Sequence, residues 1–225
     1  MSGITPGRSR RSLEQWGGLG AVIYVVLFVG GSILAYAGQP DTGDPPAKLI
    51  SYYSDSGHRD KIGFGWLITI VGVFFFLWFL GALRQFLRRI DDQGMLPAVA
   101  TIGGAVYASL TLAGRSVDAA VKTMSDDTFR HQVFPGLIHA ADDTGYLLHA
   151  AGGVGLGALM ISAALATRRA RRIPAWTAWV SIVFGILAVF SIFFIPLFLN
   201  AIWLLAAGLL LFIAQPEPSR APQPT

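Results

Sequence analysis

The sequence contains no cysteine, which excludes disulfide bridges, thiolate metal sites and iron–sulfur clusters. Charge is scarce as well, because only 13% of the 225 residues are charged, whereas a soluble domain usually carries about 25%. Short catalytic and cofactor signatures are also missing. No HExxH or comparable metal motif occurs, and the glycines lie inside apolar stretches rather than in a strand-turn-helix context. The sequence therefore gives no direct evidence for an enzyme, a cofactor or a dinucleotide site.

What the chain has instead is hydrophobicity, at 53% of all residues. Six apolar stretches of about 20 residues are each long enough, at about 1.5 Å per residue, to cross a hydrocarbon core of ~30 Å. We therefore predict an all-α fold, a polytopic transmembrane helical bundle that forms one membrane domain over residues 1–225, with flexible cytoplasmic tails at 1–15 and 215–225. The six predicted spans are 18–37, 62–83, 96–117, 144–166, 176–195 and 197–214.

The placement of basic residues predicts the orientation of these spans. If the N-terminus is cytoplasmic, eleven of the 17 lysines and arginines fall on the inner side and five in the outer loops, with Arg115 near a span end. Because positive charge is retained in the cytoplasm, both termini are expected there. The same placement accounts for the net charge of +4, so the expected partner is the lipid bilayer and not nucleic acid. The inner residues are Arg8, Arg10, Arg11, Arg84, Arg88, Arg89, Arg168, Arg169, Arg171, Arg172 and Arg220.

Two span boundaries leave alternatives open. Residues 8–37 imitate a signal peptide, and cleavage after Ala37 would leave five spans. The apolar stretch exceeds the roughly 7 to 15 residues of a usual signal core, which favours retention. Residues 176–214 are almost continuously apolar, and one helix of that length would reach ~58 Å. A tight outer turn near residues 195–200 is therefore expected, with Pro196 as the break.

Two outer loops carry helix-start signals. In the first, Asp44 as N-cap before Pro45 predicts a short helix. Tyr52 and Tyr53 would place this helix in the outer membrane interface, and the alternative is an ordinary ordered loop. In the second loop, Ser125 and the two aspartates that follow it predict another helix start.

The histidines gather on the predicted outer side, together with several aspartates. His139, Asp142 and His149 recur at helical spacing, so they share one face if the helix continues through Thr144 and Gly145. Imidazole and carboxylate are ligand types for zinc and non-haem iron, which makes these three residues candidate metal ligands or a proton site. The alternative, which we favour, is structural, with the groups solvated at the rim and Asp143 capping the fourth span. The four histidines are His58, His131, His139 and His149.

Ionisable residues inside a span are costly and usually functional, so Arg115 and Asp118 are the next candidates. Arg115 lies near the outer interface, where it can extend towards the head groups, and intrahelical pairs of Arg115 with Asp118 and of Asp118 with Lys122 are expected. His149 is expected to be buried and neutral, with a hydrogen bond to a neighbour. Together these observations define a candidate polar cluster, which consists of Arg115, Asp118, Asp142, Asp143 and His149.

Small residues predict where helices touch. Gly153 and Gly157 permit close backbone approach in the fourth span, which is therefore expected to be central. The second span, with Phe74, Phe75 and Phe76 in a row, is bulky around its circumference and is expected to face lipid.

Three local features place the chain beside known membrane protein families. They are Pro40-Asp41 in the first outer loop, residues 81–84 at the end of the second span, and residues 173–176 at the start of the fifth. With them, residues 15–214 resemble uncharacterised multi-pass families of about six spans that are common in actinobacteria. The resemblance implies a six-helix bundle in a bacterial plasma membrane and transfers no active-site residue.

The sequence therefore favours a non-enzymatic integral membrane protein, acting as an accessory, sensing or assembly component, with no catalytic residue and no cofactor assigned. The absence of charges and broken helices at mid-membrane supports this reading, because transporters usually show them. One alternative is a small transporter or permease whose outward-facing vestibule is formed by the candidate polar cluster. Another is a membrane-embedded metal-dependent hydrolase that uses the outer histidines. A cavity reaching mid-membrane would favour the transporter, and a bound metal would favour the hydrolase.

Overall fold

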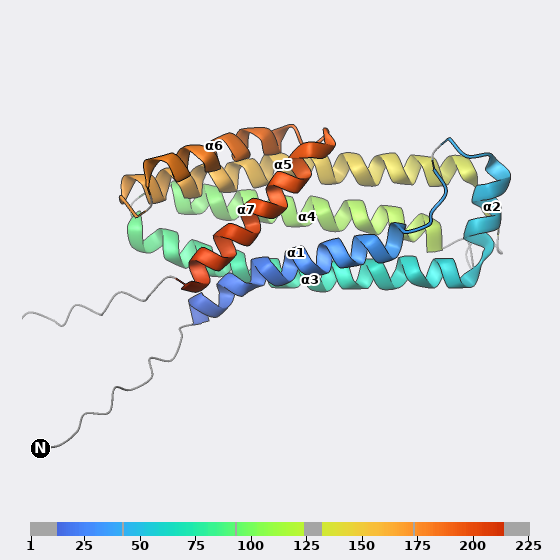
Figure 1. The fold of residues 1–225 in the computed structure, drawn as a ribbon, viewed down its shortest axis with the longest axis horizontal. Helices are drawn as coiled ribbons and strands as arrows, with labels where there is room; N and C mark the ends of the chain where they lie inside the picture. Colours follow the sequence, from blue (N-terminus) through green and yellow to red (C-terminus); the bar gives the residue numbers. More distant parts are fainter. Residues whose placement is uncertain (1–12, 42, 93, 124–131, 173, 214–225) are drawn as a thin grey trace, which may run out of the picture.

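A computed structural model of the chain describes residues 13–41, 43–92, 94–123, 132–172 and 174–213, which fold into α-helices without a β-strand (Figure 1). The prediction of an all-α bundle is confirmed. The helices are α1 (Leu13–Tyr36), α2 (Pro46–Ser54), α3 (Ser56–Ile90), α4 (Leu96–Thr123), α5 (Pro135–Arg169), α6 (Ala175–Val189) and α7 (Phe194–Ile213). The predicted tails and the helix start at Ser125 lie largely outside the described residues, except that residues 13–15 belong to α1.

Local sequence explains where the long helices begin and end. The Asp55 carboxylate accepts a hydrogen bond from the backbone N–H of His58 at 3.1 Å, which satisfies a free donor at the start of α3. Arg88 and Arg89 occupy the last turn of α3, where positive charge is favourable beside the negative end of the helix dipole. A proline, Pro135, begins α5 at a position where its missing N–H costs no hydrogen bond.

Within the described residues, five helices are long and apolar enough to cross a membrane, namely α1, α3, α4, α5 and α7. A helical membrane bundle is therefore the architecture, as predicted. The predicted fifth span, 176–195, corresponds to α6, which is apolar but has only 15 residues. At about 1.5 Å per residue, α6 is ~22 Å long, shorter than a hydrocarbon core of ~30 Å.

The turn between α6 and α7 comes earlier in the chain than predicted. Phe190 leaves the helix with φ −96° and ψ 30°, and the Ser191 hydroxyl donates to the carbonyl of Ala188 at 2.6 Å. Pro196 is the third residue of α7. The first turn of a helix has free N–H groups in any case, so the proline is accommodated there and does not form the break.

Glycine contacts join the helices as antiparallel neighbours. A methyl group added to Gly31 of α1 would lie 2.6 Å from the carbonyl oxygen of Gly65 in α3. The two glycines singled out in the sequence face α6: the same addition at Gly157 would lie 2.4 Å from the carbonyl of Gly185, and at Gly153 2.1 Å from that of Ala188. The helix axes can approach this closely only because side chains are absent. Further contacts of this kind pair Gly103 with Gly155, Gly114 with Gly145, and Gly18 with Gly208.

The aromatic run of α3 has two faces. Phe76 and Phe79 are fully buried, whereas Phe74 and Trp78 are more than half exposed. The expectation that this span faces lipid all round is therefore wrong for one face, because α3 packs along α1 on that side. The main hydrophobic core lies there, and its fully buried members include Phe76, Phe79, Leu156, Leu159 and Met160.

The two ends of the bundle differ in character. At one end, called the arginine end below, lie the α3–α4 and α5–α6 connections, the start of α1 and the end of α7 (Figure 1). The described arginines of this end are Arg84, Arg88, Arg89, Arg168, Arg169, Arg171 and Arg172. At the other end, called the cap end, α2 lies across the ends of the longer helices (Figure 1).

The short helix α2 packs onto the bundle instead of presenting its apolar side to a membrane surface. Leu49 and Tyr53 are 2% and 1% exposed, and they form a small core with residues of α3, α4 and α5. The helix begins at Pro46, after Pro45, and Asp44 does not cap it. Instead Asp44 accepts a hydrogen bond from Lys48 at 2.7 Å, an interaction that lowers the pKa of this carboxyl below its ordinary value.

Candidate functional site

A cavity of about 470 Å³ lies between α1, α4, α5 and α7, in the half of the bundle nearer the cap end. It extends from Asp142 and Asp143 to Tyr24, Tyr107 and Leu204, which are close to the midpoints of their helices. All five residues of the candidate polar cluster line this one cavity: Arg115, Asp118, Asp142, Asp143 and His149.

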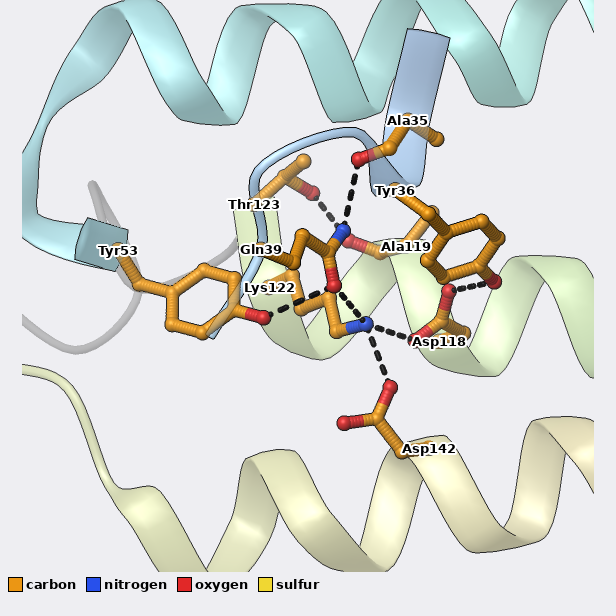
Figure 2. Close-up of polar contacts among 9 residues, drawn as sticks. All are labelled: Ala35, Tyr36, Gln39, Tyr53, Asp118, Ala119, Lys122, Thr123 and Asp142. Carbon is orange, nitrogen blue, oxygen red and sulfur yellow. Dashed lines mark hydrogen bonds and ion pairs between the residues drawn. The ribbon is translucent and has the colours of Figure 1, made fainter. Parts of the chain in front are cut away.

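A buried lysine organises the charged part of this site. The Lys122 side chain is 0% exposed, and its ammonium lies 2.6 Å from Asp118 Oδ1 and 2.5 Å from Asp142 Oδ1 (Figure 2). It also donates to the side-chain oxygen of Gln39 at 3.0 Å. A buried ammonium is tolerated only when its charge is paired and its protons are bonded, and these three oxygens meet that requirement. The expected pair of Asp118 with Lys122 is thus present.

Two tyrosines complete the surroundings of this lysine. Tyr36 of α1 donates its hydroxyl to Asp118 Oδ2 at 2.5 Å, and Tyr53 of α2 donates to the Gln39 oxygen at 3.0 Å (Figure 2). Burial raises the pKa of Tyr53 well above its ordinary value, and the carboxylates of Asp142 and Asp118 raise it further, so the hydroxyl remains a donor. The network therefore ties α1, α2, α4 and α5 together at the cap end.

Arg115 binds α1 rather than its expected partner. Its guanidinium donates to the hydroxyl of Ser32 and lies 4.8 Å from the ring centre of Phe28 and 4.9 Å from that of Tyr36. Such contacts over aromatic faces stabilise a cation. Among the residues that the structure describes, no carboxylate lies within ion-pair distance of Arg115, so the pair predicted with Asp118 is not formed.

These contacts form a ladder between α1 and α4, which run in the same direction. Its rungs join Tyr24 to Tyr107, whose hydroxyls are 2.6 Å apart, then Ser32 to Arg115, Tyr36 to Asp118, and Gln39 to Lys122. Tyr24, Ser32 and Tyr36 lie on one side of α1, and Gln39 follows the end of that helix, whereas all the ladder residues of α4 share one helix face. We name these contacts the α1–α4 ladder, and all of its residues except Gln39 and Lys122 line the cavity.

His149 lies below the charged network, inside the bundle. Its Nδ1 is 3.1 Å from the hydroxyl of Thr111, and its ring stacks on Phe28 with centres 5.3 Å apart. His149 therefore has a hydrogen-bonding neighbour, as expected from the sequence.

The candidate metal ligands do not converge. Helix α5 continues through Thr144 and Gly145 without interruption, so His139 and His149 are ten residues apart on one helix, or ~15 Å along its axis. Across the described ranges, no group of three or more histidine, aspartate or glutamate side chains is arranged to hold a metal ion. His58 stacks on Tyr52 instead, with ring centres 3.8 Å apart, and His131 lies outside the described residues.

Sequence reasoning missed the cavity residues contributed by α1 and α7. Ser32 and Tyr36 of α1 line the cavity four residues apart, and Gln39 follows three residues later, after the end of α1; this spacing resembles that of the charges on α4 and was the available signal. On α7, Asn200 lines the cavity and is 5% exposed. Its amide nitrogen donates to the Ser191 hydroxyl at 3.1 Å, while its side-chain oxygen has no partner among the described residues.

The arrangement provides groups that can bind a ligand. It offers a cation on aromatic rings, carboxylates held by a lysine, and an apolar floor, which are groups that recognise a ligand of mixed polarity. No family model, no curated protein and no solved structure matches this chain.

Proposed function

We propose that this chain is a non-enzymatic multi-pass protein of a bacterial plasma membrane that binds a ligand from the outer side, as a sensing or accessory component. The observation that carries the proposal is the cavity, since all five residues of the candidate polar cluster line it. Ligand sites in helical bundles are concave spaces of this kind, largely apolar with a few convergent polar groups.

The proposed orientation has six spans, both termini in the cytoplasm, and the cap end outside. The concentration of arginine at the opposite end supports it. In this orientation α6 forms the fifth span, together with the turn at residues 190–193. The bacterial plasma membrane rests on the resemblance noted in the sequence.

A small permease is the second candidate, and the depth of the cavity favours it. Beyond Tyr24 and Tyr107 the bundle is closed by the fully buried Phe76 and Phe79, so the arrangement corresponds to an outward-facing state. A permease must also expose the site to the cytoplasm, whereas a sensing protein has no need to do so.

The side from which a single cysteine at Asn200 is labelled distinguishes these functions. The label is specific, because the native chain has no cysteine. We expect Asn200→Cys to react with a membrane-impermeant thiol reagent in right-side-out vesicles. Val183→Cys, which lies on an exposed face of α6, serves as the lipid-facing control and should stay unreacted. Additional labelling of Asn200→Cys in inside-out vesicles would show alternating access and favour the permease. A lack of labelling from either side would overturn the proposed function.

A further inference from the structure

The cavity is divided along its length by polarity. Its deep part is bounded by Tyr24, Val25, Phe28 and Leu204, which are apolar or present aromatic rings. Its mouth carries the charged side chains of α4 and α5. A ligand that fills the cavity must therefore have an apolar portion at one end and a charged portion at the other.

The charges at the mouth follow a definite order. Helix α4 runs towards the cap end, and Arg115 precedes Lys122 by seven residues, or ~10 Å along the axis. Gly145 of α5 packs against Gly114 of α4, and the two helices are antiparallel, so Asp142 and Asp143 lie two to three residues, or ~3–5 Å, nearer the cap end than this contact. The cation is thus the deeper group and the carboxylates are the outer ones.

Only part of this charge is available to a ligand. Lys122 holds Asp118 and Asp142 at 2.6 and 2.5 Å. Arg115 has a hydroxyl and two aromatic rings around it but no neutralising carboxylate among the described residues. Asp143 is exposed at the cavity mouth. Lys122 carries one positive charge against two carboxylates, so the cavity presents a deep cation, Arg115, and an outer excess of negative charge that includes Asp143.

We propose that the cavity binds a single-chain amphiphile with a phosphoethanolamine-type head group, an inference that rests on the proposed ligand-binding function. The apolar chain lies against Tyr24 and Leu204, the phosphate binds Arg115, and the ammonium lies outermost, beside Asp143. In such a head group the phosphate is closer to the chain than the ammonium. This order matches the order of charges in the cavity.

Simpler ligands satisfy only half of the site. An amphiphile with a carboxylate or phosphate alone would neutralise Arg115 but would leave Asp143 facing negative charge. A cationic amphiphile would pair with Asp143 but would have to avoid Arg115. A neutral amphiphile would leave the Arg115 guanidinium without an anion in a partly apolar site, which is costly.

The test uses the full chain in an uncharged maltoside detergent and three probes with the same palmitoyl chain. The probes are lysophosphatidylethanolamine, lysophosphatidic acid and monopalmitoyl glycerol, and affinity is measured by titrating the shift in melting temperature. We expect lysophosphatidylethanolamine to bind most tightly. Arg115→Gln should weaken binding of both phosphate probes by about tenfold, as for loss of a charged hydrogen-bond partner, and leave monopalmitoyl glycerol unchanged.

A second variant tests the ammonium contact alone. Because Asp143 is exposed, replacing it leaves the buried hydrogen bonds of Lys122 in place. Asp143→Asn should weaken lysophosphatidylethanolamine by roughly two- to fivefold and leave lysophosphatidic acid unchanged or tighter, as for an exposed ion pair. Asp60→Asn and Arg84→Gln are matched controls, because both residues are exposed and neither lines the cavity. Neither control should change the order of the probes.

Two results would overturn the inference. Tighter binding of lysophosphatidic acid than of lysophosphatidylethanolamine would identify a site for anions alone, and equal binding of all three probes would show that head-group charge is not read. The labelling experiment can also reject the proposed ligand class without rejecting the proposed binding function. If Asn200→Cys is labelled from outside but none of the probes slows that labelling, the ligand class is wrong and the binding function stands.

Discussion

At the residue scale, the polar side chains of the site act as connections between helices. The α1–α4 ladder links two helices whose backbones hardly touch, and Lys122 adds α5 through Asp142. Tyr24, Tyr107, Asp118 and Lys122 are buried, so they depend on their partners more strongly than the members of a surface ion pair do. The same residues therefore hold the cavity wall and set its charge.

Lys122 should be among the most sensitive positions of the protein. We expect Lys122→Met to lower stability by about 3–5 kcal/mol, because it leaves the buried carboxylate of Asp118 and the partly exposed carboxylate of Asp142 without their cation. The measurement is thermal unfolding of the purified protein in detergent. Lys48→Met is the matched control, since Lys48 forms an exposed pair with Asp44 and its loss should change the melting temperature little. Similar losses of stability in both variants would contradict the conclusion that Lys122 holds the network together.

A compensated variant tests the same explanation from the other direction. Replacing Asp118 and Asp142 by asparagine in the Lys122→Met background should recover much of the lost stability, because no uncompensated charge remains. A further loss would mean that the hydrogen bonds of the carboxylates matter more than their charge.

At this scale, many residues of the candidate site could be predicted from the sequence. Their partners on other helices could not. The spacing of Asp142 and His149 placed them on one helix face, and the Asp118 to Lys122 pair followed from i,i+4 geometry. The partner of Arg115 could not be read in this way, because Ser32 lies 83 residues away in sequence and the contact depends on tertiary packing. The same holds for Asn200, which α7 brings to the cavity.

At the element scale, glycine decides which helices are neighbours. Helix α5 uses different glycines on two sides, with Gly103 and Gly114 of α4 opposite Gly155 and Gly145, and α6 opposite Gly153 and Gly157. These contacts bring backbone atoms close enough for extensive van der Waals packing, which is the main force between helices in lipid.

The α5–α6 contact predicts a strong effect of side-chain size. Gly157→Leu should lower stability by about 1–3 kcal/mol or more, because even its first carbon would lie 2.4 Å from the Gly185 carbonyl, and rigid backbone must move. Val154→Leu, on the same helix but 54% exposed, should change the melting temperature little. Equal shifts in the two variants would place α5 at the periphery and remove α6 as its neighbour.

Element boundaries show where sequence reasoning stopped. The apolar stretches of the sequence correctly placed the five long helices. Helix α5, however, begins nine residues before the predicted span, because Thr144 and Gly145 do not interrupt it. Glycine has a low helix propensity, but here Gly145 allows a close contact with Gly114. In the same way, hydrophobicity alone could not separate the buried face of α3 from its exposed face, since both carry phenylalanine.

At the scale of the whole molecule, the arrangement separates a packed half from a hollow half. The core around Phe76, Phe79 and Leu159 lies on the arginine side of the cavity, and the cavity lies between it and the cap end. Because α6 is short, the α6–α7 turn meets α5 at Tyr146, whose hydroxyl donates to the carbonyl of Ile192 at 2.5 Å. The outer parts of α1 and α5 therefore extend past α7, and the mouth of the cavity lies between them.

This asymmetry gives the orientation a direct test. With the cap end outside, Ser54→Cys should be labelled by an impermeant thiol reagent on intact cells, and Asp92→Cys only after permeabilisation; both residues are exposed, at opposite ends of the bundle. The short α6 adds a finer expectation. If it completes a sixth span, Thr177→Cys should behave like Asp92→Cys, and Phe193→Cys in the α6–α7 turn should react from the outer side. Reaction of Ser54→Cys only after permeabilisation would reverse the orientation. Reaction of Phe193→Cys only from the inner side would reduce the spans to four, because α6 and α7 would then enter and leave through the same membrane face.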